Sequence, residues 1–330
     1  MELNKIHNIN FLENTLPDKC ANLIIADPPY FEVKGSFDFV WKSFDDYLKY
    51  VEKWAVECKR LLADNGTLFW YGHAKKIAYA QVIFDMHFNL INNLVWDKGS
   101  FMGLEESEGL RSFAPCTERI LMYDNCKNKT GLQEIQNDLE LYKPIRDYFL
   151  DQKKNCSYTF KEINEKCFGT ASNGGGMASN ILTSYKDGWT FPTKEKYEAL
   201  QKIGLCPKPY EELRKEYEEL RKEYEEHRRP FANYFKLQEI FRFSNEAVKT
   251  GAKYDHDTVK PETLTRALIL TCSRPNDLVV VPFAGSGTEC AMAVKEGRKT
   301  IGFEITEKHA KMSNDRVQNI LRQPSLFVGS

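Results

Sequence analysis

Four consecutive residues carry the strongest chemical signal in the chain: Asp27, Pro28, Pro29 and Tyr30. They follow the apolar run 23–26, which predicts a strand buried on both faces of a parallel sheet. In such sheets ligands bind beyond the carboxyl ends of the strands, so an acid and an aromatic ring at this place predict a site. The alternative is a strand followed by a turn that the prolines stiffen.

These residue types suit the transfer of a methyl group to an exocyclic amine of a nucleobase. The lone pair of that nitrogen is delocalised into the ring, so an enzyme must hold the amine with acceptors that favour a tetrahedral nitrogen. The Asp27 carboxylate and the Pro28 carbonyl oxygen offer two acceptors, and proline fixes φ, so they are rigid before the substrate arrives. The ring of Tyr30 offers a face on which a base extruded from the duplex can stack.

A second segment has the pattern of a cofactor site. Residues 278–281 predict a β-branched strand, residues 284–287 a glycine-rich turn and residues 289–296 an amphipathic helix, the opening unit of a Rossmann-like fold. The next strand, 300–303, ends in Glu304, where a carboxylate usually accepts hydrogen bonds from ribose hydroxyls. No phosphate-loop lysine or complete G-x-G-x-x-G is present, which argues against a nucleoside triphosphate and disfavours a dinucleotide. The alternative is a tight strand-to-helix turn without a ligand.

Together with other segments, these motifs resemble the amino-methylating DNA methyltransferases that use S-adenosylmethionine, and within them the β class, which is defined by motif order. The segments that carry the resemblance are DPPY (27–30), NGTLFWYG (65–72), LVWDKG (94–99), ERILMYD (118–124), HDTVKP (256–261), PFAGSGT (282–288) and GFE (302–304). The resemblance implies an α/β fold: a circularly permuted Rossmann-like sheet with helices on both faces, plus an inserted, mainly helical target-recognition domain.

The resemblance also implies roles for single residues. The catalytic ones are Asp27, Pro28, Pro29 and Tyr30. The residues implied to bind S-adenosylmethionine are Asn10, Asp27, Lys260, Phe283, Gly285, Ser286, Gly287, Thr288 and Glu304. Within this set Lys260 would meet the cofactor carboxylate. The chain departs from the family at Asn10, where Gly-Asp is usual and an Asn oxygen would accept from the adenine amine, and at Val281, where Asp is common. The second departure bears on cofactor affinity.

Length and composition fit two lobes. A chain of 330 residues with 42% hydrophobic content can bury one large core and carry a smaller inserted domain. Nine cysteines without a CxxC pair predict no metal site and a reducing, cytoplasmic compartment, and no apolar run approaches a membrane span. The net charge of -1 lacks the basic footprint of a nucleic-acid binder. If the glutamate-rich segment at 210–229 faces away from DNA, a net charge of -1 is compatible with DNA binding.

We expect three segments: a first catalytic part (1–124), the target-recognition domain (125–250) and a second catalytic part with the cofactor motif (251–330). In the first part, a helix from Ser43 is expected to end at Gly66. Residues 90–96 and 119–123 predict an antiparallel pair, split by a loop around Arg111 that borders the site.

In the middle segment, residues 159–168 and 177–185 predict two helices with the outline of a helix-turn-helix, although the turn is long. The second helix would enter the major groove of DNA. The candidate base and phosphate contacts, beyond Arg111, are Asn173, Ser179, Asn180 and Lys186. The alternative is an ordinary helical hairpin with a solvated face.

The repeat YEELRKE at 210–216 and 217–223 is a heptad that continues imperfectly to Pro230. Its Tyr and Leu residues fall on one stripe, which we expect to pack either on the recognition domain or on the same helix of a second subunit. A solvated spacer arm stabilised by charge pairs is the alternative.

The function that the sequence favours is methyl transfer to adenine N6 in double-stranded DNA after base flipping. The cytosine-N4 reaction is the alternative within the enzyme class, and Asp27 favours adenine because the resembled cytosine enzymes more often carry Ser there. A DNA-binding regulator with a relict cofactor fold is the alternative from another class. The expected partners are double-stranded DNA, a second copy of the chain and, genetically, a cognate restriction endonuclease. The expected location is the cytoplasm, with the nucleoid, of a bacterium or its phage.

Overall fold

The computed structural model describes residues 1–31, 40–99, 111, 113, 115–125, 142–169, 176–183, 189–243 and 259–322, apart from the side chains of residues 224–227. The chain divides into two compact units. Residues 1–128 and 229–330 form the first, here named the sheet unit, and residues 129–228 form the second, here named the insert. Each unit is described separately.

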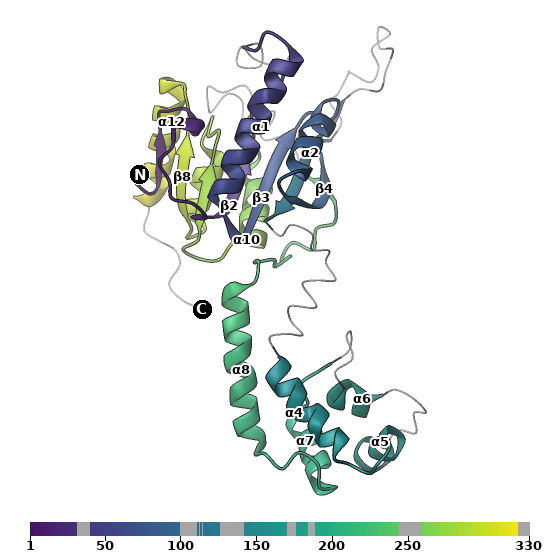
Figure 1. Cartoon of the computed structure of the whole chain (residues 1–330). Helices are drawn as coiled ribbons and strands as arrows, with labels where there is room; N and C mark the ends of the chain where they lie inside the picture. The colour runs from purple at the N-terminus through teal and green to yellow at the C-terminus, as the bar shows by residue number, and fades with distance from the viewer. Residues whose placement is uncertain are drawn as a thin grey trace. The chain divides into compact units, whose positions relative to one another are not determined.

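The sheet unit contains an eight-stranded sheet with the order β1-β8-β7-β2-β3-β5-β4-β6 (Figure 1). The strands are β1 (Lys5–His7), β2 (Ala21–Ala26), β3 (Leu62–Gly72), β4 (Asn89–Asp97), β5 (Thr117–Asp124), β6 (Ile240–Arg242), β7 (Leu278–Val281) and β8 (Lys299–Phe303). Strand β5 runs antiparallel to its neighbours β3 and β4, and the other adjacent pairs are parallel. The mostly parallel order agrees with the fold that the motifs implied.

Helices cover both faces of the sheet, as expected. One face packs on η1 (Phe11–Glu13), α1 (Phe44–Leu61) and α2 (Ile77–Asp85). The other face packs on α10 (Glu262–Cys272), α11 (Thr288–Lys295) and α12 (Glu307–Leu321). No helix in the described part of the chain is both long and apolar enough to cross a membrane.

Strand β2 lies between β7 and β3 and confirms the predicted buried central strand. Its side chains alternate between the two cores: Ile24 packs on the α1 side, whereas Leu23 and Ile25 pack on the α10 side. All three are fully buried. A strand covered on both faces is largely apolar, so the polar Asp27 marks the point where it leaves the core.

The predicted end of the first helix at Gly66 is wrong. Helix α1 ends at Leu61, and β3 begins at Leu62. Gly66 lies inside β3, where a Cβ atom would be 2.6 Å from the Leu62 Cδ1 and 3.1 Å from the carbonyl oxygen of Ala21. The glycine therefore allows close packing of two strands and does not terminate a helix.

Strands β4 and β5 form the predicted antiparallel pair, and β6 extends them. The recognition domain was expected to run to residue 250, but residues 229–243 belong to the sheet unit. The reason is local: β6 pairs with β4, where Trp96 lies opposite Phe241 and its indole nitrogen donates a 2.8 Å hydrogen bond to the Phe243 carbonyl oxygen. Both Trp96 and Phe241 are buried.

The insert is helical in its described residues. Its helices are α4 (Lys143–Lys154), α5 (Phe160–Phe168), α6 (Met177–Leu182), α7 (Lys194–Lys202) and α8 (Tyr210–His227). Helix α5 begins with a capping box at Thr159 and ends at Gly169, which has a φ of +66°. Helix α6 ends at Leu182, three residues before the predicted end. The amide nitrogen of Ala178 donates a 2.9 Å hydrogen bond to the buried side chain of Asn164, which ties α6 to α5.

Candidate active site

The predicted site residues gather where the parallel strands of the sheet unit end. Asp27 follows β2, the turn 282–287 follows β7, and Glu304 follows β8. Lys98 follows β4, and Glu118 lies near the start of the antiparallel β5, which begins at the same edge. The edge therefore combines residues from distant parts of the chain, as expected for a ligand site in an open α/β sheet.

Asp27 lies at the centre of a network of hydrogen bonds and ion pairs. Its Oδ1 accepts a 2.6 Å hydrogen bond from the Tyr30 hydroxyl, and its Oδ2 lies 2.7 Å from the Lys260 Nζ. That Nζ is also 3.3 Å from the Glu118 Oε2, and the Glu118 Oε1 accepts a 2.9 Å hydrogen bond from the Lys98 Nζ. The Lys260 side chain is only 6% exposed, so two carboxylates replace water around its charge.

The network keeps Lys260 and Glu118 charged. Burial opposes the ammonium form of Lys260, but the charges of Asp27 and Glu118 outweigh it and hold the pKa above its ordinary value. Burial likewise opposes the ionised form of Glu118, but Lys260 and Lys98 lower its pKa. The Lys260 Nζ also lies 5.0 Å from the centre of the Tyr71 ring. Lys260 is therefore a fixed cation that holds the carboxylate of Asp27, and it is not a proton acceptor at neutral pH.

Tyr30 combines a hydroxyl held by Asp27 with a ring at the border of a small pocket. Burial, and then the charge of Asp27, raise the pKa of Tyr30 well above its ordinary value, so the hydroxyl stays protonated and donates. The pocket walls are mostly aromatic. Besides Tyr30, they are formed by Phe31, Tyr47, Trp70, Tyr71, Gly72, His73, Lys76, Ile77 and Ala80.

The glycine-rich turn between β7 and α11 is fixed by α12. Gly287 has a φ of +73°, and a Cβ atom there would lie 2.7 Å from the Ser313 Cβ, so only glycine fits. The Ser313 hydroxyl donates a 2.7 Å hydrogen bond to the Gly285 carbonyl oxygen, and Arg316 donates one of 3.1 Å to the Ser286 carbonyl oxygen. The turn is therefore rigid and brings bare backbone to the site edge.

Two of the predicted cofactor acceptors hold local backbone. The Glu304 carboxylate accepts hydrogen bonds of 3.0 Å from the Gly285 amide and 2.8 Å from the Thr306 amide. The Asn10 side-chain oxygen accepts a 3.0 Å hydrogen bond from the Leu12 amide. Each of these oxygens has a second lone pair, so the contacts shape the site without exhausting its acceptors.

The other residues of the turn differ in exposure. Phe283 is half-buried with its ring 5.0 Å from the ring of Trp54, whereas Thr288 is buried and its hydroxyl accepts a 2.8 Å hydrogen bond from Arg316. Val281 is buried in the core on the α10 side. At the position where the resembled family commonly has Asp, this chain therefore has an apolar side chain in the core.

The structure describes three of the five predicted DNA contacts. Ser179 and Asn180 are in α6, where Ser179 is half-buried and Asn180 is exposed. Arg111 is exposed. Asn173 and Lys186 lie outside the described residues.

Sequence reasoning assigned no role to four charged residues near the site: Lys98, Glu118, Glu289 and Arg316. The signal for Lys98 and Glu118 was available, because each is a polar residue where a buried strand meets the site edge. Glu289 and Arg316 are on helices, where charged residues are usually exposed, so the sequence contains no signal for them. Only the packing of α11 on α12 shows that both are buried.

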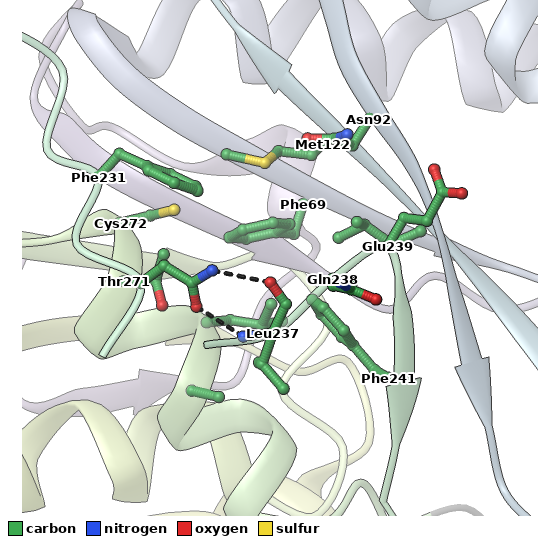
Figure 2. A pocket seen from close by; sticks show the side chains of 14 residues that line it. Phe69, Asn92, Met122, Phe231, Leu237, Gln238, Glu239, Phe241, Thr271 and Cys272 are labelled. Atoms are coloured by element: carbon green, nitrogen blue, oxygen red, sulfur yellow. Dashed lines mark hydrogen bonds between the residues drawn. The ribbon is translucent and has the colours of Figure 1, made fainter. Parts of the chain in front are cut away.

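A separate pocket of about 210 Å³ lies on the α10 side of the sheet unit (Figure 2). Phe69, Met122 and Phe241 from the sheet face Thr271 and Cys272 from α10 across it. The segment that carries Leu237 closes one side, held by two hydrogen bonds between Leu237 and the side chain of Asn233. The described lining includes none of the predicted catalytic or cofactor residues.

Comparisons with known proteins agree with these features. Residues 21–315 match the model of a family described as DNA methylase, whose label covers N6 and N4 methyltransferases. The chain is 24% identical to the type II methyltransferase M.HinfI of Haemophilus influenzae, over 94% of this chain and 67% of that protein. It is 24% identical to the DNA adenine methyltransferase YhdJ of Escherichia coli K12, over 92% and 78%. In fold it resembles a proposed DNA modification methylase of Thermus thermophilus, with a TM-score of 0.51, 17% identity and coverage of 97% and 96%.

Proposed function

The chain belongs to the DNA methylase family, and from that premise we propose that it methylates the N6 amine of adenine in double-stranded DNA. Family membership makes it a DNA amino-methyltransferase with S-adenosylmethionine as methyl donor. Two observations support adenine: the relative YhdJ is named an adenine methyltransferase, and the first residue of the catalytic motif is Asp27. Cytosine N4 is the second candidate, because the family model covers both amines.

The observation that carries the proposal is the placement of Asp27. Its carboxylate is held from two sides, by the Tyr30 hydroxyl at 2.6 Å and by the Lys260 Nζ at 2.7 Å. A carboxylate fixed in this way is a preorganised acceptor, which can orient an amine without first losing conformational freedom. The Tyr30 ring is next to it, so a base stacked on that ring would bring its amine to Asp27.

The residues of the edge also fit the methyl donor. Phe283 and Gly285 are partly exposed while their neighbours in the turn are buried, so a ligand reaches ring and backbone there. Glu304 retains lone pairs for hydroxyl donors, and the ammonium of Lys260, which pairs with Asp27 and Glu118, has a third N–H that can donate to the cofactor carboxylate. When bound, the cofactor supplies a methyl group on a positively charged sulfur. We assign its binding to these residues together with Asn10.

We further propose that the insert selects the target sequence, with α6 as the reading helix. The support is the compactness of the insert, the helix pair α5–α6 and the exposed Asn180. We also propose a cognate restriction endonuclease as genetic partner, because M.HinfI is named a type II methyltransferase. A homodimer and a cytoplasmic location with the nucleoid are proposed from the resemblance and the DNA substrate.

The test compares Asp27→Ala with wild type on duplex DNA, with Asp64→Ala as a control at an exposed carboxylate. Methylated nucleosides are identified by mass spectrometry after digestion. We expect N6-methyladenine from wild type and the control, and a loss of about a hundredfold or more for Asp27→Ala, since one preorganised acceptor contributes about 3 kcal/mol to the barrier.

N4-methylcytosine as the product would refute the choice of adenine. Activity of Asp27→Ala within about fivefold of wild type would refute the catalytic assignment.

A further inference from the structure

Glu289 is a buried acid that the proposed reaction does not yet use. It lies in the first turn of α11, two residues after Gly287 of the cofactor turn, and is 4% exposed. Its Oε1 has no hydrogen-bond partner among the described residues. A buried carboxyl oxygen without a partner is costly, so this residue requires an explanation beyond packing.

The charged groups that act on Glu289 come from three places in the fold. Asp27 at the end of β2 disfavours its ionised form, whereas Lys260 before α10 and Arg316 of α12 favour that form. The charge of Glu289 also contributes to raising the pKa of Tyr71 of β3. Burial, and then the charge of Asp27, raise the pKa of Glu289 to about 7. The acid is therefore largely neutral in slightly acidic solution.

The balance of charges around Glu289 determines when its carboxyl group ionises. In the network, Lys98 and Lys260 balance Asp27 and Glu118. Arg316 is paired with Glu262 at 2.7 Å. An ionised Glu289 would give the cluster one negative charge in excess, which explains why the neutral form is favoured. A ligand with one net positive charge would remove that excess.

The position of Glu289 indicates which ligand this is. The residue follows the cofactor turn directly in the chain, and its charge is coupled to that of Asp27, so it is near the groups proposed to bind the donor and near the group proposed to bind the acceptor. S-adenosylmethionine carries one net positive charge because of its sulfonium, and its demethylated product is neutral overall. Resting on the proposed function, we propose that Glu289 is the counter-ion of the sulfonium, protonated in the free enzyme and ionised when the methyl donor binds.

The inference predicts that binding of the donor releases a proton, because the cation stabilises the carboxylate. Isothermal titration of the whole chain at pH 6.5, in two buffers with different ionisation enthalpies, measures the number of protons released. We expect S-adenosylmethionine to release about 0.5 proton more per site than S-adenosylhomocysteine with wild type.

The matched variants are Glu289→Gln, which keeps size and removes the charge, and Glu165→Gln, which changes an exposed glutamate of the insert. In Glu289→Gln the extra proton release should vanish, and the affinity for S-adenosylmethionine should fall about tenfold relative to that for S-adenosylhomocysteine. Glu165→Gln should behave as wild type.

Equal proton release for the two ligands in wild type would overturn the inference, and this result needs no variant to fold. Equal release in wild type and Glu289→Gln would overturn it as well, because another group would then titrate. An absence of heat with either ligand in wild type would contradict the proposed function itself, which separates the two failures.

Discussion

The site edge of the sheet unit and the core of the insert use charge in opposite ways. At the edge, Lys260 and Glu289 are buried and face other charges from different elements. In the insert, the core is mostly apolar and aromatic, with Arg146 as a single side chain of the described core that carries charge, and ion pairs such as Lys194 with Glu211 are exposed on the surface. Buried charges are strongly coupled, whereas exposed pairs contribute little to stability. The edge therefore fits the proposed chemistry, and the insert fits the proposed role of presenting a surface to DNA.

Helix α8 illustrates the second design. Leu213 of its stripe is buried in the insert core, and the Tyr217 ring stacks on Phe191 at 4.3 Å and on Tyr142 at 4.9 Å. The stripe thus packs on its own unit, which is the first of the two predicted arrangements. Pairing with the same helix of a second subunit stays a prediction.

Two leucines of α8 test whether its stripe belongs to the core of the insert. Replacing Leu213 and Leu220 by Glu should destabilise the insert by about 5 kcal/mol, because it removes buried apolar surface and places charges in an apolar core. Changing the exposed Lys215 and Lys222 to Glu adds two carboxylates on the outer face of the same helix and serves as the control. Thermal melting by circular dichroism and limited proteolysis measure the loss. Unchanged melting in the Leu variant would show that α8 is a spacer.

The pH dependence of stability tests whether Glu289 is a buried acid at the site edge. The pKa of Glu289 is about 7 in the folded chain, against 4.5 for an ordinary glutamate. Between these values the folded state binds more protons than the unfolded state, so this residue lowers stability as pH rises from 5 to 8. Glu289→Gln should therefore be more stable than wild type by about 3 kcal/mol at pH 8, and by much less at pH 5. Denaturant titrations at both pH values provide the measurement, and a pH-independent difference would contradict it.

The same contrast explains what the sequence predicted. Strand β2, the unit of β7, glycine-rich turn and α11, and the helix predicted over 159–168 follow from local patterns, and all three are present. Gly66 and β6 were misjudged because strand pairing between distant segments decides them. The charge network at Asp27 also depends on such pairing, since β5 has to bring Glu118 to the edge.

Substitutions of Tyr30 should reduce transition-state stabilisation by smaller amounts. Two variants separate the stacking of its ring from the hydrogen bond of its hydroxyl. Tyr30→Ala should lose about 2 kcal/mol of transition-state stabilisation, because the stacking face for the extruded base is removed. Tyr30→Phe keeps the ring and loses only the hydrogen bond to Asp27, so it should cost about 1 kcal/mol. Turnover and the fluorescence of 2-aminopurine at the target position measure both. Equal brightening and equal turnover in wild type and Tyr30→Ala would exclude a stacking role.

Two residues of α6 test whether the insert selects the target sequence. Asn180 is exposed on α6, and Ser179 beside it is half-buried with its hydroxyl bonded to the Gly176 carbonyl oxygen at 2.8 Å. We therefore expect Asn180→Ala to change base preference more than Ser179→Ala, each by about 1–2 kcal/mol at most, because base-edge contacts discriminate by that amount. Total DNA affinity should change little, since phosphate contacts supply most of it. Sequencing of modified bases in a plasmid grown with each variant reads the preference directly. A variant that combines Asn180→Ala and Ser179→Ala and still methylates the same motif would exclude α6 as the reading helix. Another surface of the insert would then have to select the sequence.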